Sequence, residues 1–260
     1  MTPLASTPPQ LNIDGNLATI TLNRPAHRNR LEDDDLHTLL RYFEQINANT
    51  EVRVVVLTAN TSGQPRPVFC SGYHIGGFDT DTHASQFFEQ VPNALAQLRP
   101  VTICALNGSV YGGATDLFLA CDLRIALDGV ELRMPATALG LHYYPTGLQR
   151  YLTRMGPSAA RRAFLTARPF STAQLWQTGC LEAVCAPEVF DGSVNALVQD
   201  ILALAPLAVQ STKQSLNEIS TGIWHAEKLR EREELTARSS DFAEGRRAFA
   251  ERRKPQFTGQ

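Results

Sequence analysis

The residues best suited to chemistry are a glycine pair, Gly112 and Gly113, and an aspartate three positions later, Asp116. Amides at the start of a helix have no acceptor within that helix, and glycine lets another group approach them closely. Such amides bind a negatively charged oxygen, and a carboxylate one turn further on can face the same point. The pattern predicts an anion cradle beside an acid. The alternative is that the glycines serve close helix packing and that Asp116 is an ordinary first-turn acid.

These residues need a strand and a helix to hold them. Residues 101–106 form an apolar run rich in β-branched side chains, which predicts a buried strand, and residues 117–120 resume the apolar pattern as a helix. Residues 67–78 form a second glycine-rich segment, in which a short apolar strand ends at Gly72 and the backbone turns sharply around Tyr73. A bend at a strand end can direct an amide into a cleft, although a glycine-rich loop without such a role has the same pattern.

The remaining segments alternate between strand and helix patterns. Asp14 and Gly15 join two strand-like pieces within residues 11–23, which predicts a hairpin. Residues 52–58, dense in valine, predict a buried parallel strand, because continuous apolar runs suit strands covered on both faces. Together these patterns predict an α/β fold. Helices are predicted over residues 31–46, 82–98, 158–167, 172–179, 187–204, 205–219 and 224–239.

Composition narrows the class of protein. With 260 residues and 43% hydrophobic side chains, the chain can form one large domain, or one domain plus a small appendage. The formal net charge of −2 predicts neither a nucleic-acid partner nor binding to an acidic membrane. The five cysteines lack zinc-ligand spacing, so no metal site is predicted. The first ten residues show no signal-peptide pattern and no apolar run reaches membrane-spanning length, so we predict a cytoplasmic protein.

Five motifs taken together resemble the crotonase superfamily of enoyl-CoA hydratases and isomerases. They are VRVVVLT, FCSGYHI, NGSVYGGATDLFLACDLRIA, RMPATALGLHYYPTGLQRYLTRMG and DFAEGRRAFAERRKPQFTG. The likeness runs from about Asn12 to the C-terminus, with the motifs in the family's order. It implies a crotonase-like spiral of ββα units with the acyl-CoA site over residues 1–200. It also implies a helical C-terminal region over residues 201–260 that covers CoA and builds a homotrimer or a dimer of trimers.

The resemblance also implies a ligand and its contacts. The ligand is an acyl-CoA thioester, so coenzyme A enters with the substrate and no separate cofactor is expected. The thioester oxygen is expected to lie between the backbone amides of Tyr73 and Gly113, where negative charge develops as an enolate forms. Positions whose counterparts approach CoA are Arg28, Ser71, Gly72, Phe249 and Arg252. For Arg252 the alternative is a solvated surface cation.

The acid–base residues of the family are only partly matched here. Family hydratases carry two glutamates, and the corresponding positions are Asp116 and Ala136, so one carboxylate is absent. The segment around Tyr143 most resembles the branch that decarboxylates methylmalonyl-CoA, which has a tyrosine matching Tyr143 and an acid matching Asp116. Decarboxylation needs no water nucleophile, and Tyr143 is expected to orient the leaving carboxylate. The enolate is expected to take its proton from a tyrosine, from His142 or from bound water, and His74 either contacts the substrate or is a structural loop residue.

Three functional hypotheses follow. The first is an acyl-CoA decarboxylase acting on a 2-carboxyacyl-CoA such as methylmalonyl-CoA, with Tyr73, Gly113, Asp116 and Tyr143 as the catalytic set. The second is an enoyl-CoA hydratase or isomerase in which Asp116 is the sole carboxylate. The third is a catalytically silent protein that binds CoA esters.

Overall fold

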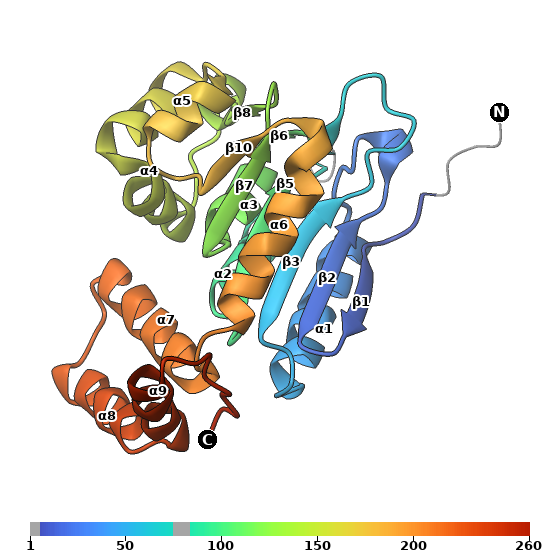
Figure 1. The fold of residues 1–260 in the computed structure, drawn as a ribbon. Coiled ribbons are helices and arrows are strands. Elements are labelled where there is room, and N and C mark those ends of the chain that lie inside the picture. The colour runs from blue at the N-terminus through green and yellow to red at the C-terminus, as the bar shows by residue number, and fades with distance from the viewer. Residues whose placement is uncertain (1–5, 75–83) are drawn as a thin grey trace.

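The computed structural model describes residues 6–74 and 84–260, and a six-stranded sheet lies at the centre of this part of the chain (Figure 1). The strand order is β1-β2-β3-β5-β7-β10, with β1 antiparallel to β2 and the other neighbours parallel. Its strands are β1 (Gln10–Asp14), β2 (Leu17–Leu22), β3 (Val54–Ala59), β5 (Val101–Leu106), β7 (Leu123–Leu127) and β10 (Ala183–Cys185).

Three predictions for this sheet are confirmed. The hairpin turns at Asp14 and Gly15, where Gly15 adopts a φ of 53°. Strand β3 is buried along almost its whole length and pairs with parallel strands on both sides, as its continuous valine run predicts. Strand β5 is likewise buried throughout, so the strand predicted just before the glycine pair forms the middle of the sheet.

A second, smaller sheet holds the turns that matter for function. It has the order β4-β6-β8-β9 and consists of β4 (Val68–Cys70), β6 (Ser109–Tyr111), β8 (Glu131–Arg133) and β9 (Phe170–Ser171). Strands β4, β6 and β8 are parallel, and β9 runs antiparallel to β8. Only β4 was predicted. All four strands are two or three residues long, but β4 is an apolar run buried at every position, whereas the others mix polar and apolar residues and cannot be distinguished from a loop.

Helices cover both faces of the large sheet (Figure 1). Helix α6 (Pro187–Leu202) lies across one face and packs its apolar side on Val54, Val101 and Ile103. Helices α1 (Asp33–Ala48), α2 (Ala84–Ala96) and α3 (Ala114–Ala120) pack together on the other face. The predicted helix over residues 82–98 is confirmed from Ala84 onward, whereas its expected start and the residues that follow His74 in the glycine-rich segment lie outside the described residues.

One helix begins much earlier than predicted. Helix α4 (Pro145–Thr166) was expected only from residue 158, because Gly156 and Pro157 have the composition of a helix boundary. The structure has a kink there instead, with Gly156 at φ 80° and ψ 162°. The first half of α4 is helical, preceded by a short 3-10 turn, η3 (Ala136–Leu139). Helix α5 (Thr172–Gln177) then follows as predicted.

The C-terminal helices form a group beside the sheet (Figure 1). They are α7 (Pro206–Thr221), α8 (Ala226–Ala237) and α9 (Ser240–Glu251). Buried Lys213 of α7 pairs with Asp122 at 2.6 Å and donates to the Pro100 carbonyl at 2.6 Å, which fixes α7 to the core. The predicted boundary at residue 201 falls near the end of α6, and the oligomeric role of this region stays a prediction.

None of the described helices alone has the length and apolar character needed to cross a bilayer. Helices α6 and α7 meet that criterion only when joined, and they are bent by 104° relative to each other.

Candidate active site

The two glycine-rich turns meet at one edge of the small sheet. They follow β4 and β6, which are parallel neighbours, so their carboxyl ends point the same way. Gly72 has a φ of 104°, and a Cβ built there would lie 3.1 Å from the Tyr111 carbonyl oxygen and 3.7 Å from the Gly113 nitrogen. Gly112 has a φ of 56°, also in the region that favours glycine. The backbones of the two turns are therefore in contact, and only glycine allows it.

The amides assigned to Tyr73 and Gly113 lie in these turns. His74 N–H donates to the Leu31 carbonyl and Leu31 N–H donates to the Gly72 carbonyl, both at 2.9 Å. Because successive amides alternate sides in extended chain, Tyr73 N–H faces the side opposite Leu31. Gly113 N–H has no hydrogen-bond acceptor within residues 6–74 and 84–260. This arrangement suits two donors to one oxygen, and the assignment itself remains a prediction.

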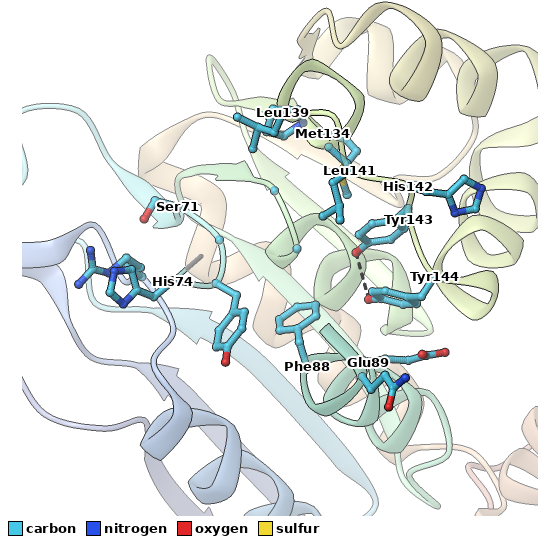
Figure 2. A pocket seen from close by; sticks show the side chains of 18 of the residues that line it. Ser71, His74, Phe88, Glu89, Met134, Leu139, Leu141, His142, Tyr143 and Tyr144 are labelled. Carbon is cyan, nitrogen blue, oxygen red and sulfur yellow. Dashed lines mark hydrogen bonds between the residues drawn. The ribbon is translucent and has the colours of Figure 1, made fainter. Parts of the chain in front are cut away.

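A cavity of about 660 Å³ opens beside the two turns (Figure 2). Most of its wall is apolar and comes from α2, from the segment between β8 and α4, and from the turns themselves. Five of the predicted site residues line it, namely Ser71, Gly72, Tyr73, Gly113 and Tyr143. The apolar wall includes Phe88, Met134, Leu139 and Leu141. Residues far apart in the sequence thus converge on a space suited to an acyl group.

The other predicted CoA contacts do not line this cavity. The Arg28 carbonyl accepts a hydrogen bond from Ser71 N–H at 3.0 Å, so its loop is adjacent, but Arg30 is the arginine on the cavity wall. Phe249 is 88% exposed and lines a separate apolar cavity among the C-terminal helices, and Arg252 is exposed at the end of α9. A CoA contact for Arg28, Phe249 and Arg252 remains a prediction.

Asp116 lies beneath the cavity wall and is not among its lining residues. Its side chain is fully buried, and Arg150 donates to Oδ1 at 2.8 Å and to Oδ2 at 2.5 Å. Tyr144 also donates to Oδ2 at 2.5 Å. Both carboxylate oxygens are therefore occupied, which makes Asp116 the anchor of a polar network.

Tyr143 extends this network to the cavity. The hydroxyls of Tyr143 and Tyr144 are 3.0 Å apart, and Figure 2 shows this bond beside the cavity. A carboxylate only accepts, so the Tyr144 proton points to Asp116 and the Tyr143 proton must point to Tyr144. The Tyr143 oxygen therefore offers a bound ligand lone pairs, with its proton directed elsewhere.

The remaining polar groups near the cavity differ in orientation. Figure 2 shows the His142 ring pointing away from the cavity, and His74 Nδ1 lies 3.1 Å from a Glu32 carboxylate oxygen. Ala136 lines the wall and supplies no polar group. Glu89 of α2 also lines the cavity and was not singled out from the sequence. The helical pattern there was carried by its apolar residues, and nothing local indicated that the following acid faces the same space.

No described cluster of three or more His, Cys, Asp or Glu side chains is arranged to hold a metal ion. The cysteines are free thiols, all of them buried. The polar groups that line the cavity are backbone amides, the phenol hydroxyls of the tyrosines, the Glu89 carboxylate, and the side chains of Arg30, Ser71, His74, Gln86 and His142.

Known proteins are similar to this chain in sequence and in fold. Residues 12–260 match the family model described as enoyl-CoA hydratase/isomerase. The chain belongs to the enoyl-CoA hydratase/isomerase family. A Bacillus subtilis protein named as an enoyl-CoA hydratase/isomerase, YngF, is 30% identical over 94% of this chain and 95% of its own length. The 2,3-dehydroadipyl-CoA hydratase of Escherichia coli is 28% identical over 92% of this chain and 94% of its own.

Solved structures of this family confirm the predicted fold. An enoyl-CoA hydratase from Bacillus anthracis superposes with a TM-score of 0.87 at 26% identity, covering 98% of this chain and 100% of that one. An enoyl-CoA hydratase/carnithine racemase from Magnetospirillum magneticum gives a TM-score of 0.89 at 26% identity, covering 98% and 97%. The crotonase-like resemblance inferred from five motifs is thus confirmed across almost the whole chain.

The tyrosines of this family member give a prediction for alkaline stability. Burial raises the pKa of Tyr143, Tyr144 and Tyr151 above the ordinary value of 10, and the Asp116 charge raises them further. Above about pH 10 the unfolded chain loses tyrosine protons that the folded chain keeps. A raised folded-state pKa therefore adds stability below that pH and loses it as the pH rises, by up to about 1.4 kcal/mol per pH unit for each tyrosine.

The measurement is the melting temperature from about pH 8 to about pH 11. The Tyr144→Phe variant is expected to show a shallower alkaline decline than the parent, because one such proton is removed. Tyr42→Phe, at a partly buried tyrosine of α1, serves as the matched control. Equal slopes for the parent and Tyr144→Phe would contradict the assignment.

Proposed function

We propose that this protein stabilises the enolate of an acyl-CoA thioester and that its reaction is the decarboxylation of a 2-carboxyacyl-CoA such as methylmalonyl-CoA. One observation carries the choice of reaction. Of the two positions where family hydratases are expected to have carboxylates, one is Ala136 and the other is Asp116, whose oxygens are both held by Arg150 and Tyr144. A water nucleophile has no free carboxylate pair to activate it at these positions.

The bond changes in this reaction need little from the protein. The bond between the α-carbon and the carboxylate breaks, its electron pair enters the enolate, and carbon dioxide leaves. The negative charge then collects on the thioester oxygen, which lies between the amides proposed for Tyr73 and Gly113. Each fixed donor at that position contributes about 3 kcal/mol to the transition state. A proton must then be added to the α-carbon.

The part of the cavity wall around Tyr143 favours loss of the substrate carboxylate. A carboxylate placed there meets apolar side chains and an oxygen whose proton is already directed to Tyr144. An ionised group with no donor in such surroundings is destabilised, and release of carbon dioxide removes that charge. Tyr143 thus acts by disfavouring the charged group, with Asp116 fixing the proton direction through Tyr144.

Hydration or isomerisation of an enoyl-CoA is the second candidate. The names of the relatives support it, since YngF is named as an enoyl-CoA hydratase/isomerase and the Escherichia coli protein as a 2,3-dehydroadipyl-CoA hydratase. Asp116 is poorly suited to act as the sole carboxylate in its present contacts, so this candidate requires either rearrangement of the Arg150 pair or another acid on the wall.

The test is turnover of two substrates by the purified full-length protein. Carbon dioxide release from methylmalonyl-CoA is expected, with hydration of crotonyl-CoA at least about 100-fold slower, in line with the loss of one general acid–base group. Gly72→Ala, which disrupts the contact between the two turns, is the inactive control for both reactions. Rapid crotonyl-CoA hydration without carbon dioxide release would overturn decarboxylation and favour the second candidate.

A further inference from the structure

Asp116 and Glu89 are two carboxylates near the cavity wall formed by α2 and the start of α4, and their hydrogen-bond partners differ. Asp116 is buried outside the lining residues and both its oxygens are occupied. Glu89 lines the cavity and is partly exposed. Its Oε1 accepts one hydrogen bond, from Thr146 Oγ1 at 2.8 Å. Its Oε2 has no hydrogen-bond or ion-pair partner in the described segments 6–74 and 84–260.

The position of Glu89 is fixed from both sides. It follows Phe88, whose ring lies so close to Gly113 that a Cβ built on that glycine would be 2.8 Å from Phe88 Cζ. Thr146, at the start of α4, holds Oε1, and four residues further along α2 the side chain of Asn93 accepts from Arg150 at 2.8 Å. Helix α2 is therefore tied to α4 at two points, which fixes Glu89 on the cavity wall next to Phe88, the residue that contacts Gly113.

Arg150, the arginine that links α4 to α2, forms its hydrogen bonds with residues other than Glu89. Arg150 directs its Nε and Nη2 to Asp116 and its Nη1 to Asn93, and none of these hydrogen bonds reaches Glu89. Tyr144 likewise donates to Asp116. Because these groups neutralise the buried acid, the glutamate on the wall keeps one oxygen available for a proton from a bound ligand.

We propose that Glu89 is the residue that carries a proton to and from the α-carbon of the bound acyl group. This inference rests on the proposed enolate chemistry. In one direction the α-carbon–hydrogen bond breaks, its electron pair enters the enolate, and the proton passes to the Glu89 carboxylate. After decarboxylation the enolate carbon takes the proton of the Glu89 carboxylic acid, which water then restores.

A purely structural role for Glu89 predicts a different effect of the Glu89→Gln substitution on the reaction rate. If the carboxylate only ties α2 to α4 through Thr146, glutamine would keep an oxygen for the same hydrogen bond and the chemistry would be unaffected. Glutamine cannot accept and return a proton at catalytic rates. The Glu89→Gln variant therefore separates the two roles.

The experiment follows deuterium entering the α-carbon of butyryl-CoA in heavy water by proton NMR. This ligand has no carboxylate to lose and no double bond to hydrate, so only enolate formation is observed. The parent protein is expected to exchange the α-hydrogens, and Glu89→Gln to do so at least about 100-fold more slowly. Glu44→Gln, the same substitution at an exposed site on α1, is expected to leave exchange unchanged. The dissociation constant of butyryl-CoA should stay within about threefold of the parent for Glu89→Gln, because an isosteric amide preserves the packing.

The outcomes distinguish this inference from the proposed function. Exchange by Glu89→Gln within threefold of the parent would overturn the role of Glu89 and leave the enolate proposal standing. Absence of exchange in the parent, with no turnover of methylmalonyl-CoA or crotonyl-CoA, would overturn both. Loss of exchange in Glu89→Gln with intact binding, and a smaller loss in Thr146→Val, would support Glu89 as the proton carrier held by Thr146.

Discussion

Replacing Gly113 with proline is expected to lower kcat/KM for an acyl-CoA thioester about 100- to 1000-fold, because the change removes one amide donor to the developing oxyanion. The backbone there has φ −55°, which proline can adopt, so the turn need not open. Steady-state turnover with the preferred thioester gives the measurement. Retention of kcat/KM within about threefold would contradict the assignment of this amide.

The control must separate the missing amide from steric crowding. Any Cβ at position 113 would lie 2.8 Å from Phe88 Cζ, so Gly113→Ala alone also disturbs the wall. We therefore compare Gly113→Pro and Gly113→Ala in a Phe88→Leu background, where the ring is gone. The alanine variant keeps its N–H and is expected to lose markedly less activity than the proline variant. Equal losses would attribute the effect to packing.

Replacing Arg150 with methionine is expected to destabilise the fold by about 3–5 kcal/mol, because it leaves the buried Asp116 charge without its partner. The Arg150 side chain is 13% exposed and that of Asp116 is 0% exposed, so water cannot compensate for the lost pair. This loss is a large part of the about 5–15 kcal/mol that keeps a typical domain folded. Chemical denaturation of the full-length protein measures it directly.

Two further variants complete the experiment. Arg161→Met, at an exposed arginine of the same helix, should change stability by less than about 0.5 kcal/mol. The double variant Asp116→Leu with Arg150→Met should recover most of the loss, since an apolar pair of similar volume replaces a buried ion pair at little cost. A single-variant loss below about 1 kcal/mol would show that the pair behaves as an exposed one.

Local sequence patterns were sufficient to predict the helices and strands that bury a long apolar face. The hairpin at Asp14 and Gly15 and the strand at β3 are examples, because turn chemistry and continuous valines are readable within a few residues. Strands β6, β8 and β9 were missed, since they are short and exist through pairing with distant segments. The early start of α4 was missed because Gly156 kinks a helix there without ending it.

In the site, too, the sequence did not predict the contacts that join residues distant along the chain. The turn carrying Gly113 was identified from its glycines, and five of the nine predicted site residues do line one cavity. The contact of Asp116 with Arg150 joins residues far apart in sequence, so the occupied state of this carboxylate was not readable in advance. Glu89 was missed for a related reason. Its neighbours across the cavity come from other segments of the chain.

Different segments of the chain supply the reactive groups of the cavity and the apolar side chains that limit the size of the acyl group. The amide-bearing turns follow β4 and β6 and the proposed proton carrier Glu89 belongs to α2, whereas Met134, Leu139 and Leu141 come from the stretch after β8. Leu139 is 61% exposed and Leu141 41%, so their size can change with little effect on the core. Substitutions in that one stretch can therefore allow the cavity to accept longer or bulkier acyl chains, while the reaction proposed for the thioester stays the same.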